Sequence, residues 1–132
     1  MPKIKKMNSD TRKHKITDRG NLGEHFVCEY LEKHGCSIVA KNYRCRFGEI
    51  DIIAENNDFI IFVEVKTRTA HSMTGGFESI TQSKIKKFTT TVMDYLSKND
   101  SSKQPRIDCA EVIVNDNNNL VKIDYIENAV IN

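Results

Sequence analysis

Three ionisable residues, Asp51, Glu64 and Lys66, lie within runs of otherwise apolar residues. The runs, residues 47–54 and 59–68, are rich in Ile, Val and Phe and flank a turn-forming segment, which predicts two buried strands paired as a hairpin. Because side chains alternate along a strand, Glu64 and Lys66 point the same way, roughly 6–7 Å apart. A charge in a core strand is costly unless it is paired or binds a metal, so these residues need a chemical reason.

A divalent-metal site would supply that reason. The carboxylates of Asp51 and Glu64 are hard oxygen ligands, which hold Mg²⁺ or Mn²⁺ together with water and phosphate oxygens. The ion would offset the repulsion between the carboxylates, polarise a phosphodiester and help to make hydroxide from water. Lys66 would orient that water or stabilise the developing negative charge. The alternative is a salt bridge of Lys66 with one carboxylate at a sheet edge, which adds little stability; the pattern favours the metal site.

The sequence around these residues carries a more specific signal than their spacing. Asp51 and Glu64-Val65-Lys66 resemble the motif of the PD-(D/E)xK nuclease superfamily. Further matching segments are Gly23-Glu24, Tyr30-Leu31, Asn42 to Arg46, Gly48 to Asp51 and Phe62 to Arg68. Together, over residues 23–114, they resemble the bacterial YraN-type family, small predicted endonucleases related by fold to archaeal Holliday junction resolvases. The resemblance implies a restriction-endonuclease-like αβββαβ core and metal-dependent hydrolysis of nucleic acid.

A helix predicted over about residues 21–34 carries a further carboxylate. Glu24 lies on the same side of this helix as Cys28 and Leu31, next to the core. From the residues alone, a glutamate in the first turn can simply complement the helix dipole. In nucleases of the resembled class a glutamate from this helix joins the metal site, so the resemblance implies that Glu24 completes the set formed by the two strand carboxylates.

Basic residues near the predicted site are candidates for contacts with a nucleic-acid backbone. Some precede the first strand, one follows the second strand and could clamp a phosphate, and one lies in the first turn of a predicted helix, whose free N–H groups suit an anion. The predicted contacts are made by Arg44, Arg46, Arg68 and Lys84. For Arg44, Arg46 and Lys84 a solvated surface charge is the alternative.

Two neighbouring features stay open at the level of sequence. Glu49 shares the face of Asp51 and either assists the metal or bonds to Arg44 or Arg46. The loop from Thr69 to Gly76, closed by two glycines, is suited to a mobile flap.

Length, charge and cysteine usage restrict the domain organisation, the cellular compartment and the kinds of partner that we expect. The 132 residues are expected to form one domain, residues 20–132, after a basic arm, residues 1–19, that either binds phosphate backbone or is a solvated tail. The net charge of +2 does not by itself indicate a nucleic-acid binder. With no apolar segment suited to a signal peptide or membrane span and no zinc spacing among four cysteines, we expect a cytoplasmic protein with free thiols and no membrane partner.

The remaining segments complete an α/β fold. Strands are predicted over residues 37–40, 106–114 and 120–126, and a helix over residues 82–98 carries an apolar stripe at helical spacing. Asp108 and Glu111 fall on opposite faces of their strand and are interpreted as structural. We therefore expect a mixed sheet of four or five strands flanked by helices.

The predicted function is that of an endonuclease that hydrolyses phosphodiester bonds in nucleic acid, with DNA, including branched DNA, expected ahead of RNA. Asp51, Glu64 and Glu24 would hold Mg²⁺ or Mn²⁺, and Lys66 would position the attacking water. The alternative is a non-catalytic nucleic-acid-binding module on a nuclease-like fold, which would have no need for buried charges. Junction cutting requires two symmetrically placed sites, so a homodimer would follow by analogy.

Overall fold

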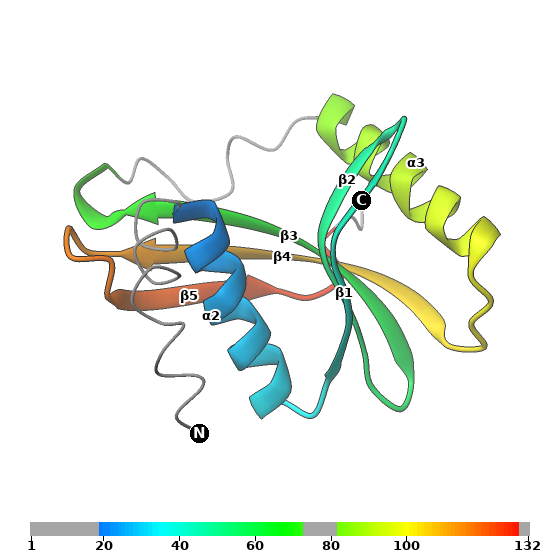
Figure 1. Cartoon of the computed structure of the whole chain (residues 1–132), viewed down its shortest axis with the longest axis horizontal. Coiled ribbons are helices and arrows are strands. Elements are labelled where there is room, and N and C mark those ends of the chain that lie inside the picture. Colours follow the sequence, from blue (N-terminus) through cyan, green and yellow to red (C-terminus); the bar gives the residue numbers. More distant parts are fainter. Residues whose placement is uncertain (1–18, 73–81, 130–132) are drawn as a thin grey trace, which may run out of the picture.

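Five strands form one mixed sheet, in the order β1-β2-β3-β4-β5 (Figure 1). The computed structural model describes residues 19–72 and 82–129. Its elements are α2 (Arg19–Lys33), β1 (Ser37–Cys45), β2 (Gly48–Glu55), β3 (Phe59–Thr69), the short 3-10 helix η1 (Ala70–Ser72), α3 (Gln82–Lys98), β4 (Gln104–Val114) and β5 (Leu120–Ile126). This order confirms the predicted α/β class with its αβββαβ core.

The strand connections explain why the sheet is mixed. β1 pairs with β2, β2 with β3, and β4 with β5 in antiparallel fashion, whereas β3 and β4 run parallel. Parallel neighbours need a long crossover, and α3 lies in the connection between β3 and β4. The predicted hairpin between the two apolar strands is the β2–β3 pair.

The two helices cover different faces of the sheet, because alternate side chains of β3 pack against α2 and against α3. Ile61 and Val63 pack in a cluster with Val27 and Leu31 of α2. Ile60 and Phe62 instead pack with three side chains of α3, namely Phe88, Val92 and Tyr95. Since alternate residues of a strand share a face, residues 64 and 66 continue the α3 side and residue 65 continues the α2 side.

Element boundaries agree with the sequence for some segments and differ for others. α3 and β5 have the predicted limits, and α2 ends before Gly35, whose φ of +86° suits a residue without a side chain. β1 is longer than predicted: the polar run after Ala40 stays in the strand as far as Cys45. Polar residues are tolerated there because β1 is an edge of the sheet and its burial alternates.

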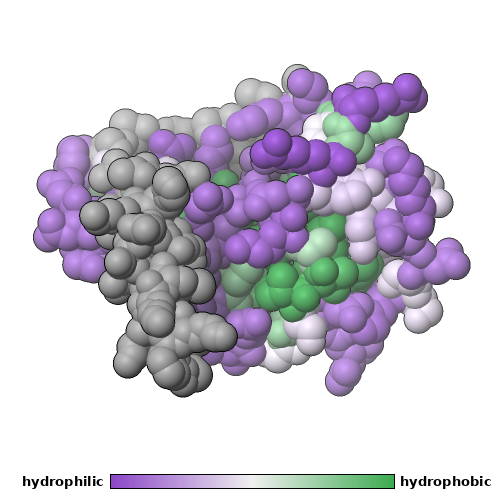
Figure 2. Space-filling view, viewed as in Figure 1, coloured by the Kyte–Doolittle hydropathy of each residue, from purple (hydrophilic) through white to green (hydrophobic). Residues whose placement is uncertain are grey.

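Several predicted features fall outside the described residues. The basic arm lies there except for its last residue, and so do residues 73–76 of the loop proposed as a flap. Within residues 19–72 and 82–129, no helix combines the length and apolar content needed to cross a membrane. Figure 2 shows a face that is hydrophilic over much of its described surface, with one hydrophobic patch to the right of α2.

All four cysteines are free thiols, as the absence of any paired spacing predicts. Burial raises the pKa of Cys109 to about 11, and it also raises the pKa of Cys28 and Cys36. A thiol with a raised pKa is a poor nucleophile at neutral pH. These three cysteines are therefore not candidates for nucleophilic chemistry.

Candidate active site

The site is built at the point where β2 and β3 separate. Their pairing runs from Glu55 opposite Ile60 to Ile52 opposite Val63, and Asp51 and Glu64 are the next residues beyond that last pair. Beyond it, β2 continues beside β1 and β3 continues beside β4, so the two strands diverge (Figure 1). We call this point the fork. The two carboxylates that the sequence singled out both lie at it.

Asp51 is held in the fork by a backbone hydrogen bond. The amide of Val65 donates to Asp51 Oδ2 at 2.8 Å, so the carboxylate occupies a position that a neighbouring strand would otherwise fill. On β1, Asn42 lies between the residues that pair with Ile50 and Ile52, and its φ of +53° marks irregular backbone. The residues on either side of Asp51 face opposite sides of the sheet at this irregularity. Ile50 packs in the cluster with the side chains of α3, and Ile52 packs in the cluster with the side chains of α2.

Electrostatics make Asp51 the most perturbed carboxylate of the fork. Burial raises its pKa to about 7, the hydrogen bond from Val65 counteracts that rise, and the negative charges of Glu64, Glu24 and Glu49 increase it. A carboxylate with such neighbours is unfavourable in its charged form unless a cation is close. A bound cation would therefore stabilise the ionised form of Asp51.

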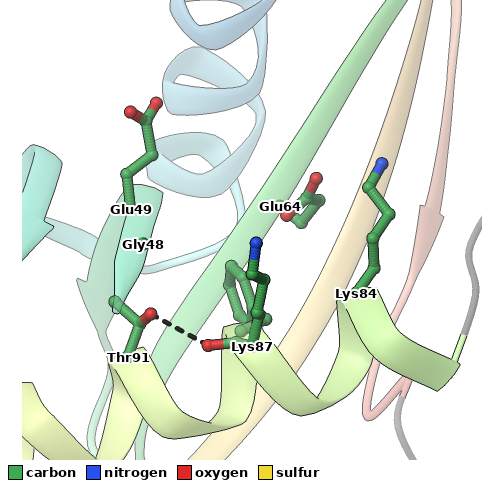
Figure 3. A pocket seen from close by; sticks show the side chains of 7 residues that line it. Gly48, Glu49, Glu64, Lys84, Lys87 and Thr91 are labelled. Atoms are coloured by element: carbon green, nitrogen blue, oxygen red, sulfur yellow. Dashed lines mark hydrogen bonds between the residues drawn. The ribbon is translucent and has the colours of Figure 1, made fainter. Parts of the chain in front are cut away.

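Glu64 faces two lysines on the α3 side of the sheet. Burial raises the pKa of Glu64, while Lys84 and Lys66 act in the opposite direction. A hydrogen bond with Lys84 lowers the pKa of Lys66, and burial and the charge of Lys84 add to this effect. Figure 3 shows Glu64 on its strand with Lys84 and Lys87 rising toward the same pocket from α3. An acid and several amines thus meet at this edge of the fork.

A small cavity lies beside Glu64. Its volume is about 150 Å³, and it is lined by Gly48, Glu49, Glu64, Lys84, Lys87, Phe88 and Thr91 (Figure 3). Gly48 has a φ of +152°, and a Cβ added to it would lie 3.0 Å from Thr91 Oγ1. Glycine therefore allows the start of β2 to approach α3 closely enough to close one wall of the cavity.

Glu24 reaches the fork from the other helix. A Cβ on Gly23 would overlap Thr67 Oγ1, so only glycine allows this part of α2 to lie so close to β3. Glu24 is buried at 7% exposure, and its negative charge contributes to the raised pKa of Asp51. The prediction that Glu24 lies next to the core, rather than on the solvent side, is confirmed.

The donor set fits a hard cation bound largely by water and substrate. Within residues 19–72 and 82–129, no three His, Cys, Asp or Glu side chains are grouped so that they could hold a metal by themselves. The structure thus does not assemble Glu24, Asp51 and Glu64 into a closed three-carboxylate site. Mg²⁺ commonly uses one or two carboxylates plus water and phosphate oxygens, and Asp51 and Glu64 provide such a pair.

The other predicted site residues have other partners. Glu49, whose role was open, pairs with Arg44 at 3.1 Å between Oε1 and Nε, and both side chains are exposed. Arg68 was predicted just beyond its strand, and this is wrong, because β3 continues to Thr69. Its Nε donates at 2.6 Å to Oε2 of Glu111, which is 2% exposed, so that guanidinium also neutralises a buried acid.

Arg46 and Phe47 mark a second surface, which lies close to Lys87. The Arg46 guanidinium lies 4.8 Å from the centroid of the Phe47 ring, and both residues lie in the turn between β1 and β2. Phe47 was interpreted as part of a buried run but is 36% exposed. Lys87 lines the cavity beside Glu64; the sequence groups it with Lys84 and Lys86 in a basic patch, and its spacing of three residues from Lys84 puts both on one side of the helix.

Comparisons with known proteins place these residues in a family context. Residues 23–112 match the model of the uncharacterised protein family UPF0102. A UPF0102 protein of Clostridium novyi is 42% identical over 111 residues, which cover 83% of this chain and 92% of that protein. One from Dichelobacter nodosus is 40% identical over 94 residues, 71% of this chain and 75% of the relative. One from Caldanaerobacter subterraneus is 39% identical over 112 residues, 83% and 92% of the two chains.

Proposed function

The chain belongs to the uncharacterised protein family UPF0102, and from the geometry of its fork we propose that it is a metal-dependent nuclease that hydrolyses phosphodiester bonds. One observation carries the proposal. Asp51 and Glu64 each lie one residue beyond Ile52 and Val63, the last pair before β2 and β3 separate, and Lys66 and Lys84 lie beside Glu64. Acids that could share a cation and amines that could meet a phosphate therefore converge at one point.

The fit to a metal rests on the chemistry of the acids. Asp51 and Glu64 are the residues that would hold Mg²⁺ or Mn²⁺, and Glu24 would support them by adding negative charge from α2. Bound there, such an ion supplies Lewis-acid polarisation of the phosphoryl oxygen and a lower pKa for water. The raised pKa of Asp51 supports this assignment, because a nearby cation favours the ionised carboxylate.

The lysines act on the water and on the phosphate. Lys66 lies beside Glu64 on the same face of β3, where its amine can form a hydrogen bond with the attacking water and hold it in position. Lys84 and Lys87 present positive charge to the same cavity and would stabilise the charge that develops on the phosphate. In this assignment Lys66 positions the water, and the two residues of α3 bind the group that it attacks.

Nucleic acid is the substrate class that this arrangement suits, with DNA proposed ahead of RNA. Arg46, Arg68 and Lys84 are the proposed contacts to its backbone, with Arg44 joining when its exposed pair with Glu49 opens. Exposed ion pairs are weak, so a phosphate can compete for Arg44. If branched DNA is the substrate, two copies of the chain must act together, and a homodimer is part of the proposal in that case alone.

A non-catalytic nucleic-acid-binding module is the competing function. Such a module needs a positively charged surface. It does not need acids in the fork, where burial removes water from the carboxylates of Asp51 and Glu64. Only the nuclease would release a cleaved nucleic-acid product. Metal-dependent cleavage separates them, whereas binding alone does not.

The test is a cleavage panel. Labelled single-stranded, duplex, flapped and four-way branched DNA, and matched RNA, are incubated with the protein in EDTA, Mg²⁺ or Mn²⁺. We expect metal-dependent cleavage of at least one form and its loss in the double variant Asp51→Ala, Lys66→Ala, with folding checked by circular dichroism. Cleavage by the folded double variant at the wild-type rate, or salt-sensitive binding with no product under any metal, would overturn the proposal.

A further inference from the structure

A second cavity opens on the outside of the candidate active site. It has a volume of about 420 Å³ and is lined by Arg46, Phe47, Lys86, Lys87 and Thr90. Its walls are the turn between β1 and β2 on one side and the exposed side of α3 on the other. We call it the tip groove. Lys87 lines both the tip groove and the cavity beside Glu64, so the two are adjacent.

The lining chemistry is positive charge beside an aromatic ring. Three of the five described lining residues are cationic and none is a carboxylate. The Thr90 hydroxyl donates to the carbonyl of Lys86 at 2.9 Å, so the side chains that remain to meet a ligand are the three cations and Phe47. A surface of this kind attracts a polyanion that also offers flat apolar groups.

Phe47 lies at the surface, outside the two apolar clusters of the described structure. It is 36% exposed, in the turn between β1 and β2. The Arg46 guanidinium lies 4.8 Å from its ring centroid, which gives the ring a charged neighbour without burying it. An exposed aromatic ring next to arginine is the arrangement on which single-stranded nucleic acids stack their bases.

The type of strand follows from what a ring can contact. Bases inside a duplex stack on each other and present only their edges in the grooves, whereas an unpaired base has a free face. The volume of the tip groove also falls in the range of sites for small organic groups, and a base with its sugar is such a group. Both observations favour an unpaired segment over a duplex.

We propose that the tip groove binds an unpaired stretch of nucleic acid, with one base stacked on Phe47 and the backbone phosphates on Arg46, Lys86 and Lys87. The strand then passes Lys87 into the cavity beside Glu64. This path rests on the proposed nuclease function, and it narrows the substrate to nucleic acid with a single-stranded segment next to the bond that is cut. Binding in the groove itself needs neither metal nor cleavage.

The experiment measures binding by fluorescence anisotropy in EDTA, so that cleavage does not interfere. The probes are labelled oligothymidylate and oligouridylate of about twelve nucleotides, an abasic strand of equal length and charge, and a duplex of the same length. Wild-type protein should bind oligothymidylate at least about fivefold more tightly than the abasic strand, because stacking of a base is lost. The oligouridylate arm tells whether DNA or RNA is preferred.

The variant Phe47→Ala removes the ring. It should weaken oligothymidylate binding at least about fivefold and leave binding of the abasic strand within about twofold of the wild type. Val39→Ala is the matched control, since Val39 is apolar, 42% exposed and on β1 but does not line the groove. It should change neither affinity.

The charges are tested with a second pair. Lys86→Ala should weaken binding of every strand alike and lower the slope of log affinity against log salt by about 0.7, the value for one contact to single-stranded nucleic acid. Lys98→Ala removes the same charge from the other end of α3, where Lys98 pairs with Asp94, and should leave the slope unchanged. Equal slopes for the two variants would overturn the phosphate contact at Lys86.

The outcomes separate this inference from the nuclease proposal. Equal affinity of wild-type protein for oligothymidylate and the abasic strand overturns the stacking site without any variant. So does a duplex that binds more tightly than oligothymidylate and loses as much affinity with Phe47→Ala. If the cleavage panel yields product while either of these results is obtained, the nuclease proposal is supported and the tip-groove proposal is overturned. If single strands bind through Phe47 but are not cleaved, the tip-groove proposal is supported and the nuclease proposal is overturned.

Discussion

Two clusters of buried charge lie in the same sheet and are built differently. In one, Asp108 on β4 has 0% exposure and is surrounded by donors. Arg106 donates to it from Nε at 3.0 Å and from Nη2 at 2.9 Å, the Tyr125 hydroxyl donates at 2.6 Å, and the Asn128 amide donates at 2.9 Å. Each carboxylate oxygen accepts two hydrogen bonds, as a buried charge requires if it serves stability.

In the other cluster, Asp51 has acids for neighbours. Among the described residues the Val65 amide donates a hydrogen bond to it, and burial, followed by the charges of three glutamates, raises its pKa. Asp108 pairs with Val63 of β3 and lies one residue beyond Cys109, where the pairing of β4 with β5 ends, whereas Asp51 lies at the fork of β2 and β3; the two acids therefore differ in their donors and not in strand pairing. The comparison teaches that burial of an acid is not informative until its donors are counted. The satisfied acid is structural, and the under-satisfied one is the candidate for chemistry.

The strongest test of this contrast is Asp51→Asn. If Asp51 holds a cation, the isosteric amide should lower cleavage by about 10³-fold or more, equivalent to roughly 4 kcal/mol in the barrier. The free energy of unfolding near neutral pH should not fall, because an acid with a raised pKa destabilises the folded state when charged. Single-turnover cleavage and urea denaturation measure the two quantities. A clear loss of stability would assign Asp51 to the structural class.

Asp108→Asn should give the opposite pattern. It removes the negative charge that Arg106 and Tyr125 share, and breaking a buried pair in this way costs roughly 3 kcal/mol or more. Cleavage by the molecules that remain folded should match the wild type. Urea denaturation, with activity normalised to the folded fraction, measures both. A stable variant that cleaves poorly would contradict the division between the two clusters.

Glu24→Gln should have a smaller effect on cleavage than the change at Asp51. Glu24 acts on the fork through its charge, so its loss should lower cleavage by about 10- to 100-fold, the range for groups that orient metal ligands. Glu32→Gln is the matched control, because Glu32 is an exposed glutamate of the same helix. Steady-state cleavage at several Mg²⁺ concentrations measures both variants, and an unchanged rate would remove Glu24 from the site.

The smallest expected effect is a dependence of metal stabilisation on pH. The folded-state pKa of Asp51 is about 7, above its ordinary value of 3.8, so the folded state binds the extra proton between these values. Stability contributed by this group is therefore present at low pH and falls as pH rises toward 7. Mg²⁺ should restore it, by about 1.4 kcal/mol at tenfold excess over its dissociation constant.

Thermal unfolding with and without Mg²⁺ measures this restoration. The increase in Tm should be larger at about pH 8 than at about pH 5.5, where Asp51 is mostly protonated, and should be absent in Asp51→Asn. An equal increase at both pH values, or in both proteins, would contradict binding at Asp51. This measurement needs no substrate and is independent of cleavage.

Much of the fold was predictable because it depends on local patterns. Each apolar run around Asp51 and Glu64 predicts one strand, and the apolar stripe of α3 predicts one helix. The order of these elements along the chain limits the possible topologies. The extent of β1 was not predictable from composition. Polar residues such as Arg44 and Arg68 remain in strands because the neighbouring strand supplies hydrogen bonds and, for Arg68, a buried acid.

The amino-acid sequence by itself determined which residues are able to do chemistry and which face each of them shares. The alternation of β3 puts Glu64 and Lys66 on one side, and helical spacing puts Glu24 next to the core. The tertiary structure alone decided what they meet: Asp51 at the fork beside Glu64, Lys84 near Lys66, and Phe47 exposed beside Arg46. The physical reason is range, since periodicity acts over a few residues whereas the divergence of β2 and β3 depends on strands and helices far apart in the chain.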